Sequence, residues 1–322
     1  MPHYLGSAVD LTAIRTALVA ACTSHGWTWN SGSGVLSKGA LHLHIALADP
    51  DILFTGRTSA SAGAMPNAVH MGRLLNYSLG PSFAPTYPLQ YEIFVFDDPV
   101  DEVWMVINYD VDRYQWVGFG KSSIPVPGTG MWVAAIIGLG YTTSDILNAA
   151  LITGPFVMTP TAGGAYRNAS NHYANGALAW NTAVRTGSPT CQLDHYVHSD
   201  LDGHGWRVDD NNLATELPGV RLLTELLNAQ PSAWNTEAAL IPARIYKVRP
   251  SNRLSLVADL INVRHVRIDN YEPGQVIELG PDRWKVFPWH RKNLSARDGG
   301  GSSNSTIDHS GTFGYAVRYD GD

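Results

Sequence analysis

The sequence predicts an α+β fold that is predominantly antiparallel β, with one N-terminal helix, a loop-rich middle section and more than one domain. Many short segments alternate between apolar and polar residues, which is the pattern of half-buried strands. Glycine (31 residues) and proline (19 residues) are abundant, as in chains with many turns. The 322 residues exceed the usual size of a single core, so two or three domains are expected.

The first element is a helix over the segment LTAIRTALVAACTSH. Asp10 stands directly before it as the N-cap, and Gly26 follows it as a stop signal. Apolar residues recur at helical spacing at Leu11, Ile14, Leu18 and Cys22. Cys22 and the distant Cys191 are expected to be two buried thiols, without a disulfide framework.

Strands follow the helix. Trp27 and Trp29 alternate into a hairpin-like region, leucine and isoleucine alternate from residue 41 to residue 47, and residues 52–56 can return beside them. His42 and His44 share the opposite face of this strand. Two imidazoles on one face can bind a metal or respond to mild acid, but an exposed or partner-facing strand surface is the favoured interpretation because no third ligand lies nearby.

The most strand-like block covers residues 91–98, 102–110 and 114–121. The connections between these segments are short enough for antiparallel hairpins, which predicts a three-stranded meander packed on the helix. Residues 1–124 are therefore expected to form one α+β domain, ending at the turn-rich segment IPVPGTG.

Residues 125–244 are expected to be a loop-rich section with short helices, one capped by Ser144 and one over residues 217–231. Residues 245–322 are expected to form a C-terminal aromatic β unit with three short strands and a Gly/Ser linker at residues 298–311. In this unit Trp284 and Val286 alternate with Lys285, as in a half-buried strand.

The C-terminal unit carries many aromatic residues but no activated nucleophile or acid/base pair. It is therefore interpreted as a docking element and not as a catalyst, because aromatic residues and arginine dominate interface energetics. Ordinary core packing is the alternative for these side chains. The residues expected at interfaces are Trp284, Phe287, Trp289, Arg291, Phe313, Tyr315 and Tyr319.

Charged residues make up 16% of the chain, below the roughly 25% of an average soluble protein. This deficit suggests a surface partly covered by partners, with an ordinary secreted β-rich protein as the alternative. The net charge of −6 gives no global case for nucleic-acid binding. No basic region precedes the first apolar run and no apolar run is long enough to span a bilayer, so synthesis in a cytoplasm is the expectation.

The best metal candidate is the segment CQLDHYVHSDLDGHGWRVDD, because imidazole and carboxylate are ligands that zinc and harder cations prefer. The candidate ligands in this segment are His195, His198, Asp200, Asp202 and His204. A calcium loop that starts at Asp200 fails at position twelve, which is Asn211 where a bidentate Glu is expected. A polar surface loop is favoured over a metal site, and no cofactor is expected.

An acidic cluster lies between the first two meander strands. It contains Asp97, Asp98, Asp101 and Glu102. A carboxylate pair can perform acid/base work on a glycan, but such clusters at hairpin tips usually serve turn formation and solubility. The chain contains no G-x-S-x-G elbow and no P-loop, and its glycines do not form a dinucleotide-binding pattern.

Two segments resemble structural proteins of tailed bacteriophage particles. The first is PVDEVWMVINYDVDRYQWVGFGKS with the following PGTG turn, within residues 99–130. The second is YEPGQVIELGPDRWKVFPWHRKN with the closing SGTFGYAVRYDG, within residues 271–321. Together they cover about a third of the chain, and they carry no known catalytic residues.

The resemblance implies a virion structural subunit, most naturally in the tail or baseplate and without enzymatic activity. Such a protein is synthesised in the host cytoplasm and contacts other phage structural proteins and copies of itself in a symmetric assembly. The alternative function is a tail-associated protein that binds or degrades a glycan, with aromatic residues such as Trp104 and Trp116 lining the groove.

Overall fold

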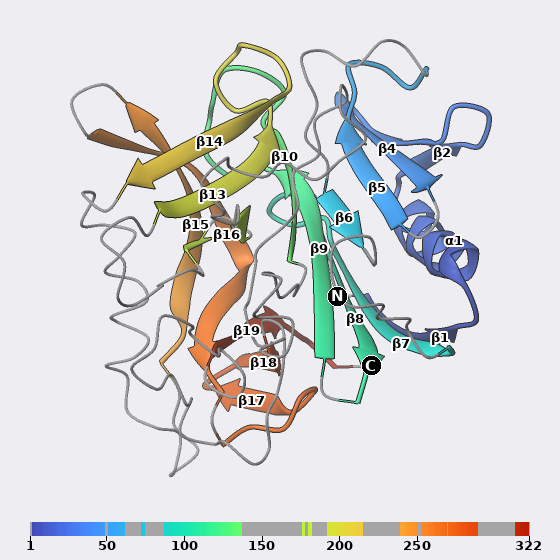
Figure 1. The fold of residues 1–322 in the computed structure, drawn as a ribbon. Helices are drawn as coiled ribbons and strands as arrows, with labels where there is room; N and C mark the ends of the chain where they lie inside the picture. Colours follow the sequence, from blue (N-terminus) through green and yellow to red (C-terminus); the bar gives the residue numbers. More distant parts are fainter. Residues whose placement is uncertain are drawn as a thin grey trace, which may run out of the picture.

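The computed structural model describes residues 2–48, 51–61, 72–74, 87–111, 113–136, 176–177, 180–181, 192–214, 239–249, 253–268, 270–288 and 313–321. These residues are mostly antiparallel β-strand, with one helix near the N-terminus, as predicted (Figure 1). The strands are distributed over several sheets, which indicates more than one domain.

The largest sheet has seven strands, each antiparallel to its neighbours. In spatial order they are β1 (His3–Ala8), β7 (Leu89–Phe96), β8 (Glu102–Asp110), β9 (Arg113–Lys121), β10 (Met131–Ile136), β13 (Gln192–Ser199) and β14 (Arg207–Ala214). The predicted meander forms its β7, β8 and β9. The sheet continues past residue 124, because β9 and β10 pair on the two sides of the IPVPGTG turn.

A second sheet and the helix come from the N-terminal part of the chain. The sheet contains β2 (Thr28–Asn30), β3 (Val35–Lys38), β4 (Leu41–Ala48), β5 (Asp51–Gly56) and β6 (Gly72–Leu74), in chain order. Helix α1 (Leu11–Thr23) begins after the predicted cap, where the Asp10 carboxylate accepts a hydrogen bond from the Ala13 N–H at 2.7 Å.

The C-terminal sheet also has five strands. They lie in the order β15 (Ile241–Arg249), β16 (Arg253–Arg267), β19 (Phe313–Arg318), β18 (Asp282–Pro288) and β17 (Val276–Leu279). The three aromatic segments predicted as strands are β17, β18 and β19. A separate short pair contains β11 (Gly176–Ala177) and β12 (Trp180–Asn181).

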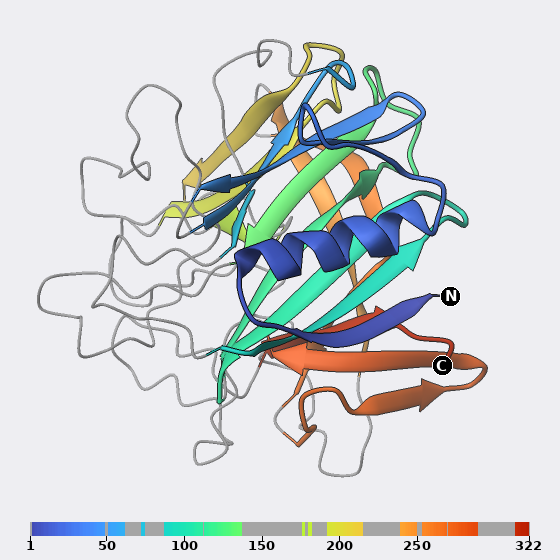
Figure 2. The same cartoon turned by 90° about the vertical axis from the view of Figure 1, so that its right-hand side faces the viewer.

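The seven-stranded sheet is the middle layer of the molecule, because successive residues of its strands enter two different cores. On β7, Ile93 and Val95 join the core beneath α1 and β2–β6, while Phe94 and Phe96 join the core shared with the C-terminal sheet. Figure 2 shows α1 on one side of this sheet and the C-terminal strands on the other.

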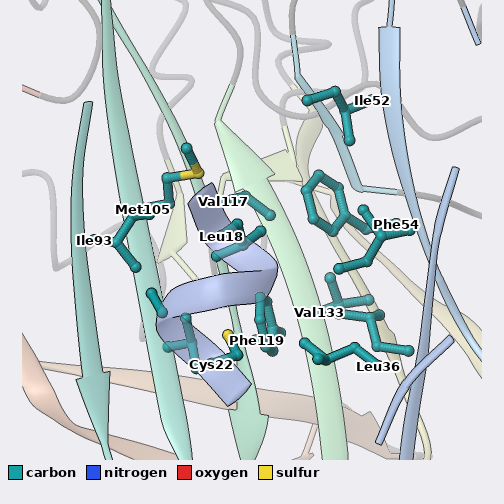
Figure 3. Packing of buried hydrophobic residues seen from close by; sticks show 14 of the residues in the cluster. Leu18, Cys22, Leu36, Ile52, Phe54, Ile93, Met105, Val117, Phe119 and Val133 are labelled. Atoms are coloured by element: carbon teal, nitrogen blue, oxygen red, sulfur yellow. The ribbon is translucent and has the colours of Figure 1, made fainter. Parts of the chain in front are cut away.

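The core beneath α1 joins the helix to the middle layer and to the sheet β2–β6. Leu18 and Cys22 on the helix pack with Met105 and Phe119 of the middle layer and with Phe54 of β5 (Figure 3). All of these side chains are buried. The prediction that the helix packs on the meander is therefore confirmed.

Three tryptophans lie in the core between the middle layer and the C-terminal sheet. Trp104, Trp116 and Trp132 of the middle layer are buried against Phe287 and Tyr315 of the C-terminal sheet. The Trp116 and Tyr315 ring centroids lie 5.1 Å apart in an edge-on contact. The Trp116 indole N–H donates to the Pro288 carbonyl at 3.0 Å, so a hydrogen bond as well as apolar packing joins the two layers.

The C-terminal strands differ from the half-buried pattern expected of them, because both of their faces are packed. Phe287 and Tyr315 face the middle layer, while Trp284, Val286 and Ala316 form a third core on the other face. On β19, Ala316 lies on the face opposite Tyr315, and both residues are buried.

The helices expected near Ser144 and over residues 217–231 lie outside the described residues, as does the linker at residues 298–311. Within the part of the chain that the structure describes, no helix is both long and apolar enough to cross a membrane.

Candidate interaction surface

Strand β1 is an outer strand of the middle layer, and half of its backbone hydrogen-bonding groups point away from the sheet. Its register with β7 runs without interruption from the pair His3 and Phe94 to the pair Ala8 and Leu89. The Val95 N–H donates to the Pro2 carbonyl at 3.2 Å. Hydrogen-bonded pairs alternate along an antiparallel ladder, so even-numbered residues of β1 bond to β7 and odd-numbered residues direct their N–H and C=O outward.

The odd-numbered positions at the end of β1 also expose large apolar side chains. Leu5 is 68% exposed, and Val9, just beyond the strand, is 72% exposed. Val111, in the turn between β8 and β9, is 93% exposed and lies at the same end of the sheet, as the registers of β1, β7 and β8 require. Exposed apolar residues gathered at a sheet edge are typical of a surface that contacts another protein.

A charged cluster holds the other half of β1 against the C-terminal sheet. One oxygen of the Glu92 carboxylate, on β7, accepts hydrogen bonds from the His3 Nε2 at 2.6 Å and from the Lys285 ammonium at 2.5 Å. These side chains are only 3%, 14% and 13% exposed for His3, Glu92 and Lys285. The Lys285 ammonium also lies 5.4 Å from the centre of the Tyr319 ring. The cluster therefore joins β1, β7 and β18 and keeps the edge strand in place.

A groove of about 180 Å³ lies next to this cluster. It is lined by residues of the middle-layer strands β1, β7, β8 and β9, and by Pro273 and Phe287 of the C-terminal part of the chain. The polar lining includes Gln90, Glu92 and Asn108, and Tyr114 supplies an aromatic ring. The groove therefore combines a small apolar surface with amide and carboxylate groups.

Four of the residues expected at interfaces are buried in the interior of the protein. Trp284, Phe287, Tyr315 and Tyr319 are 6%, 4%, 0% and 7% exposed, and they pack between strands of the C-terminal sheet and the middle layer. Their place in the structure is thus in the cores. Their role in contacts between chains stays a prediction.

The remaining three interface residues cannot be placed at a surface or in a core. Trp289 and Arg291 lie outside the described residues. Phe313 begins β19, and nothing is described of its side chain.

The metal candidates are distributed over β13 and the turn after it. His195 and His198 lie on β13, where only the backbone is described. Asp200 is buried and accepts a hydrogen bond from the Thr129 N–H at 2.9 Å, so it supports the turn between β9 and β10. Asp202 is half-buried and His204 is exposed. Among the described side chains, no group of three or more His, Cys, Asp or Glu residues could hold a metal ion.

The two histidines of β4 have neighbours of their own. His42 Nδ1 lies 2.8 Å from the Ser37 hydroxyl, and His44 Nδ1 lies 3.2 Å from the Arg57 guanidinium. Burial lowers the pKa of both imidazoles, and the charges of Arg57 and Arg15 lower that of His44 further. These contacts favour neutral histidines that hydrogen-bond within the sheet.

The acidic cluster divides into exposed and buried members. Asp97 and Asp98 are exposed, and Asp101 forms an ion pair with Lys38 at 2.5 Å. Glu102 is 1% exposed and lies between the middle layer and β16, where burial raises its pKa to about 7. The Glu102 carboxyl has a pKa suited to acid/base work, but its burial keeps a polysaccharide away from it.

Sequence reasoning missed the β1 edge. The segment HYLGSA contains one tyrosine and one leucine and lies immediately before the helix signal, so its alternation is too short to predict a strand. The signal that could have found it is the absence of charged residues between Pro2 and Val9, in a chain that places a capped helix directly afterwards.

Comparison with known proteins assigns the chain to no family. No family model matches it, and no curated protein matches it.

Proposed function

We propose that this protein is a structural subunit of a tailed bacteriophage particle, most naturally of the tail or baseplate, that acts through contacts with copies of itself and with other particle proteins. The observation that carries the proposal is the open edge of β1, where outward backbone groups coincide with Leu5 and Val9. The phage setting is supported by the resemblance of two segments, which form β8 and β9 and the strands β17, β18 and β19.

The layered packing fits this function. The aromatic side chains of the resembling segments join the middle layer to the C-terminal sheet through a shared core. Packed layers with an exposed, apolar edge suit a subunit whose binding surface is formed before it meets its partner.

Deletion of the gene from the phage that carries it tests the proposal. We expect particles with missing or incomplete tails in electron micrographs, and normal tails when the intact gene is supplied in trans. Particles with normal morphology and normal infectivity after deletion would contradict the proposal.

A second function, glycan binding, is favoured by the groove beside Glu92. The half-buried Tyr114 supplies an aromatic ring for a sugar to stack on, and the exposed Gln90 supplies an amide for its hydroxyl groups. Titration of host surface polysaccharide into the wild-type chain and into Tyr114→Ala separates the two functions. Saturable binding that Tyr114→Ala abolishes would favour the glycan function, and the absence of binding would leave the structural function alone.

A further inference from the structure

One part of the contact between the middle layer and the C-terminal sheet is made by polar groups. The Ser122 hydroxyl, directly after β9, donates to the Val257 carbonyl of β16 at 2.6 Å. The Ser123 hydroxyl donates to the Asp259 carbonyl of the same strand at 3.1 Å. Glu102 contacts β16 a few residues further along. These five residues and Asn262, the partner of Glu102 on β16, are the polar seam.

The Glu102 carboxyl is buried in this seam among hydrogen-bond donors. It accepts from the Trp104 indole at 2.5 Å and from the Asn262 side-chain amide at 3.2 Å, and the Asn262 backbone N–H also donates to it. Both Glu102 and Asn262 are at most 1% exposed. The carboxyl is therefore out of contact with water while the seam is closed.

A bulge in β16 brings Asn262 to Glu102. Residues 261–263 stand opposite no residue of β15, because the register between the two strands shifts there. The Arg264 guanidinium donates to the Leu260 carbonyl at 3.0 Å, which supports one end of the bulge. The place of the Asn262 donors therefore depends on the backbone of β16, so a movement of this segment removes both of them from Glu102 together.

A polar cavity of about 490 Å³ lies beside the seam. Its lining includes Ser122 and Ser123, and also Asp101, the residue directly before Glu102. The turn that carries Glu102 and the loop that carries the two serines thus meet at a space that water can enter. Separation of this loop from β16 brings Glu102 into contact with that space.

We propose that the polar seam is a pH-dependent contact, which stays closed while Glu102 carries a proton and opens toward the cavity far more often once Glu102 has lost it. A neutral carboxyl costs little to bury, whereas an ionised one is stabilised by the water that opening admits. The hydrogen bonds from Trp104 and Asn262 favour the ionised form, but burial outweighs them and raises the pKa of Glu102 to about 7. The inference concerns the single chain and does not depend on the proposed function.

The strands around Glu102 bring one positive charge and one neutral imidazole near it. Its neighbours in the sheet are Phe96 of β7 and Gly120 of β9, which do not titrate. On β16 the Arg264 charge lowers the pKa of Glu102, by less than burial raises it. Burial lowers the pKa of His265 to about 3, so this imidazole stays neutral from pH 4.5 to pH 7. Charged groups further out are exposed or in ion pairs, namely Asp97, Lys121, Asp101 with Lys38, and Asp259 with Arg244.

Amide hydrogen exchange of the purified chain tests the proposal. The exchange rate of an amide, divided by its intrinsic rate at the same pH, gives the equilibrium constant for opening when closing is fast. The pKa of Glu102 is about 7 when buried and returns to 4.5 when hydrated. The opening constants of the Ser122 and Asn262 amides should therefore rise by up to about 50-fold between pH 5 and pH 7.5.

A comparison within the wild-type chain separates opening of the seam from unfolding. Ile93 and Met105 pair in the ladder of β7 and β8, beneath α1, which stays closed when only the seam opens. At pH 7.5 the Ser122 and Asn262 amides should have opening constants at least tenfold larger than those of Ile93 and Met105. Equal constants for the two sets would contradict the proposal, because the seam would then open only when the whole chain unfolds.

Glu102→Gln is the matched variant, because it keeps the size of the side chain and cannot ionise. The Asn262 side-chain oxygen, which is buried without a hydrogen-bond partner, can rotate to accept from the new amide. We expect the opening constant at Ser122 to change less than threefold between pH 5 and pH 7.5 in this variant. Glu278→Gln removes an exposed carboxylate and should behave as wild type does.

The same pH dependence of the Ser122 amide in wild type and in Glu102→Gln would overturn the proposal. If Glu102→Gln does not fold, the comparison of seam and ladder amides in the wild-type chain still decides. Neither result affects the gene-deletion test of the proposed function.

Discussion

At the scale of single residues, Glu102 is a fully buried carboxyl group whose pKa is raised. Its carboxylate accepts hydrogen bonds from the Trp104 indole N–H at 2.5 Å and from the Asn262 side-chain amide at 3.2 Å. Burial raises the pKa of Glu102 from 4.5 to about 7, although these hydrogen bonds act in the opposite direction. Asn262 lies where the register between β15 and β16 is irregular, so a local bulge brings this amide to the carboxylate.

The raised pKa of Glu102 predicts a stability change with pH. Between pH 4.5 and pH 7 the folded chain keeps a proton on Glu102 that the unfolded chain releases, so this group's stabilising contribution is complete below pH 4.5 and is lost as the pH rises to 7. The loss is at most about 3 kcal/mol. Glu102→Gln cannot titrate, so urea unfolding should show wild type losing stability relative to this variant over that interval.

The titration of His265 changes stability with pH in the opposite direction to that of Glu102. The comparison with Glu102→Gln is therefore needed to isolate the contribution of Glu102. Burial lowers its pKa to about 3, with the Arg264 charge acting in the same direction, so its contribution is complete above pH 6.5 and is lost as the pH falls toward 3. The two titrations oppose each other between pH 4.5 and pH 6.5. A difference between wild type and Glu102→Gln that does not change with pH would contradict the assigned role of Glu102.

Variants of two tryptophans in the C-terminal segment can distinguish an effect on folding from an effect on assembly. Trp289→Ala is expected to impair particle assembly more than folding, because Trp289 was assigned to an interface from its sequence context. Trp284→Ala is the matched comparison, since Trp284 is 6% exposed and its truncation should cost about 3–5 kcal/mol of stability. Thermal melts and an assembly assay compare both variants. Equal losses in both measurements for Trp289→Ala would place that residue in the core instead.

At the scale of elements, the turn between β13 and β14 contacts the sheet β2–β6 through the side chain of Trp206. Trp206 is buried over β5, and its indole N–H donates to the Arg57 carbonyl at 2.9 Å. A Cβ added at Gly56 would lie 2.0 Å from a carbon of this ring. The glycine therefore permits the close approach of the ring to the strand.

Replacement of Gly56 should weaken the contact between β5 and Trp206. Gly56→Ala is expected to destabilise the chain by about 1–3 kcal/mol, because the ring of Trp206 must move. Gly32→Ala is the control, since the nearest neighbour of its added Cβ is the Asn30 side-chain oxygen at 3.4 Å. Urea unfolding of both variants checks the difference, and equal stability of the two would show that the indole does not hold the strand.

The elements were more predictable than their arrangement. The N-cap at Asp10 and the alternation from Leu41 to Ile45 predict α1 and β4, because both signals are local. The pairing of β1 with β7 joins residues such as His3 and Phe94 that lie far apart in sequence, so no local pattern predicts it. For the same reason the burial of both faces of β18 could not be predicted.

At the scale of the whole molecule, the aromatic residues have a role that composition alone did not predict. Trp104, Trp116 and Trp132 join layers within one chain, so their abundance reflects internal packing. The three most exposed large apolar residues of the described chain lie instead at the end of the middle layer, at Leu5, Val9 and Val111. The place of this candidate surface therefore depends on sheet order, which the sequence does not reveal locally.

The copy number of the chain in gradient-purified phage particles tests the account most directly, measured by quantitative mass spectrometry against a labelled standard of the same chain. We expect several copies per particle, in a fixed ratio to a known tail protein. A chain that is absent from purified particles and remains in the soluble part of the lysate would contradict the account.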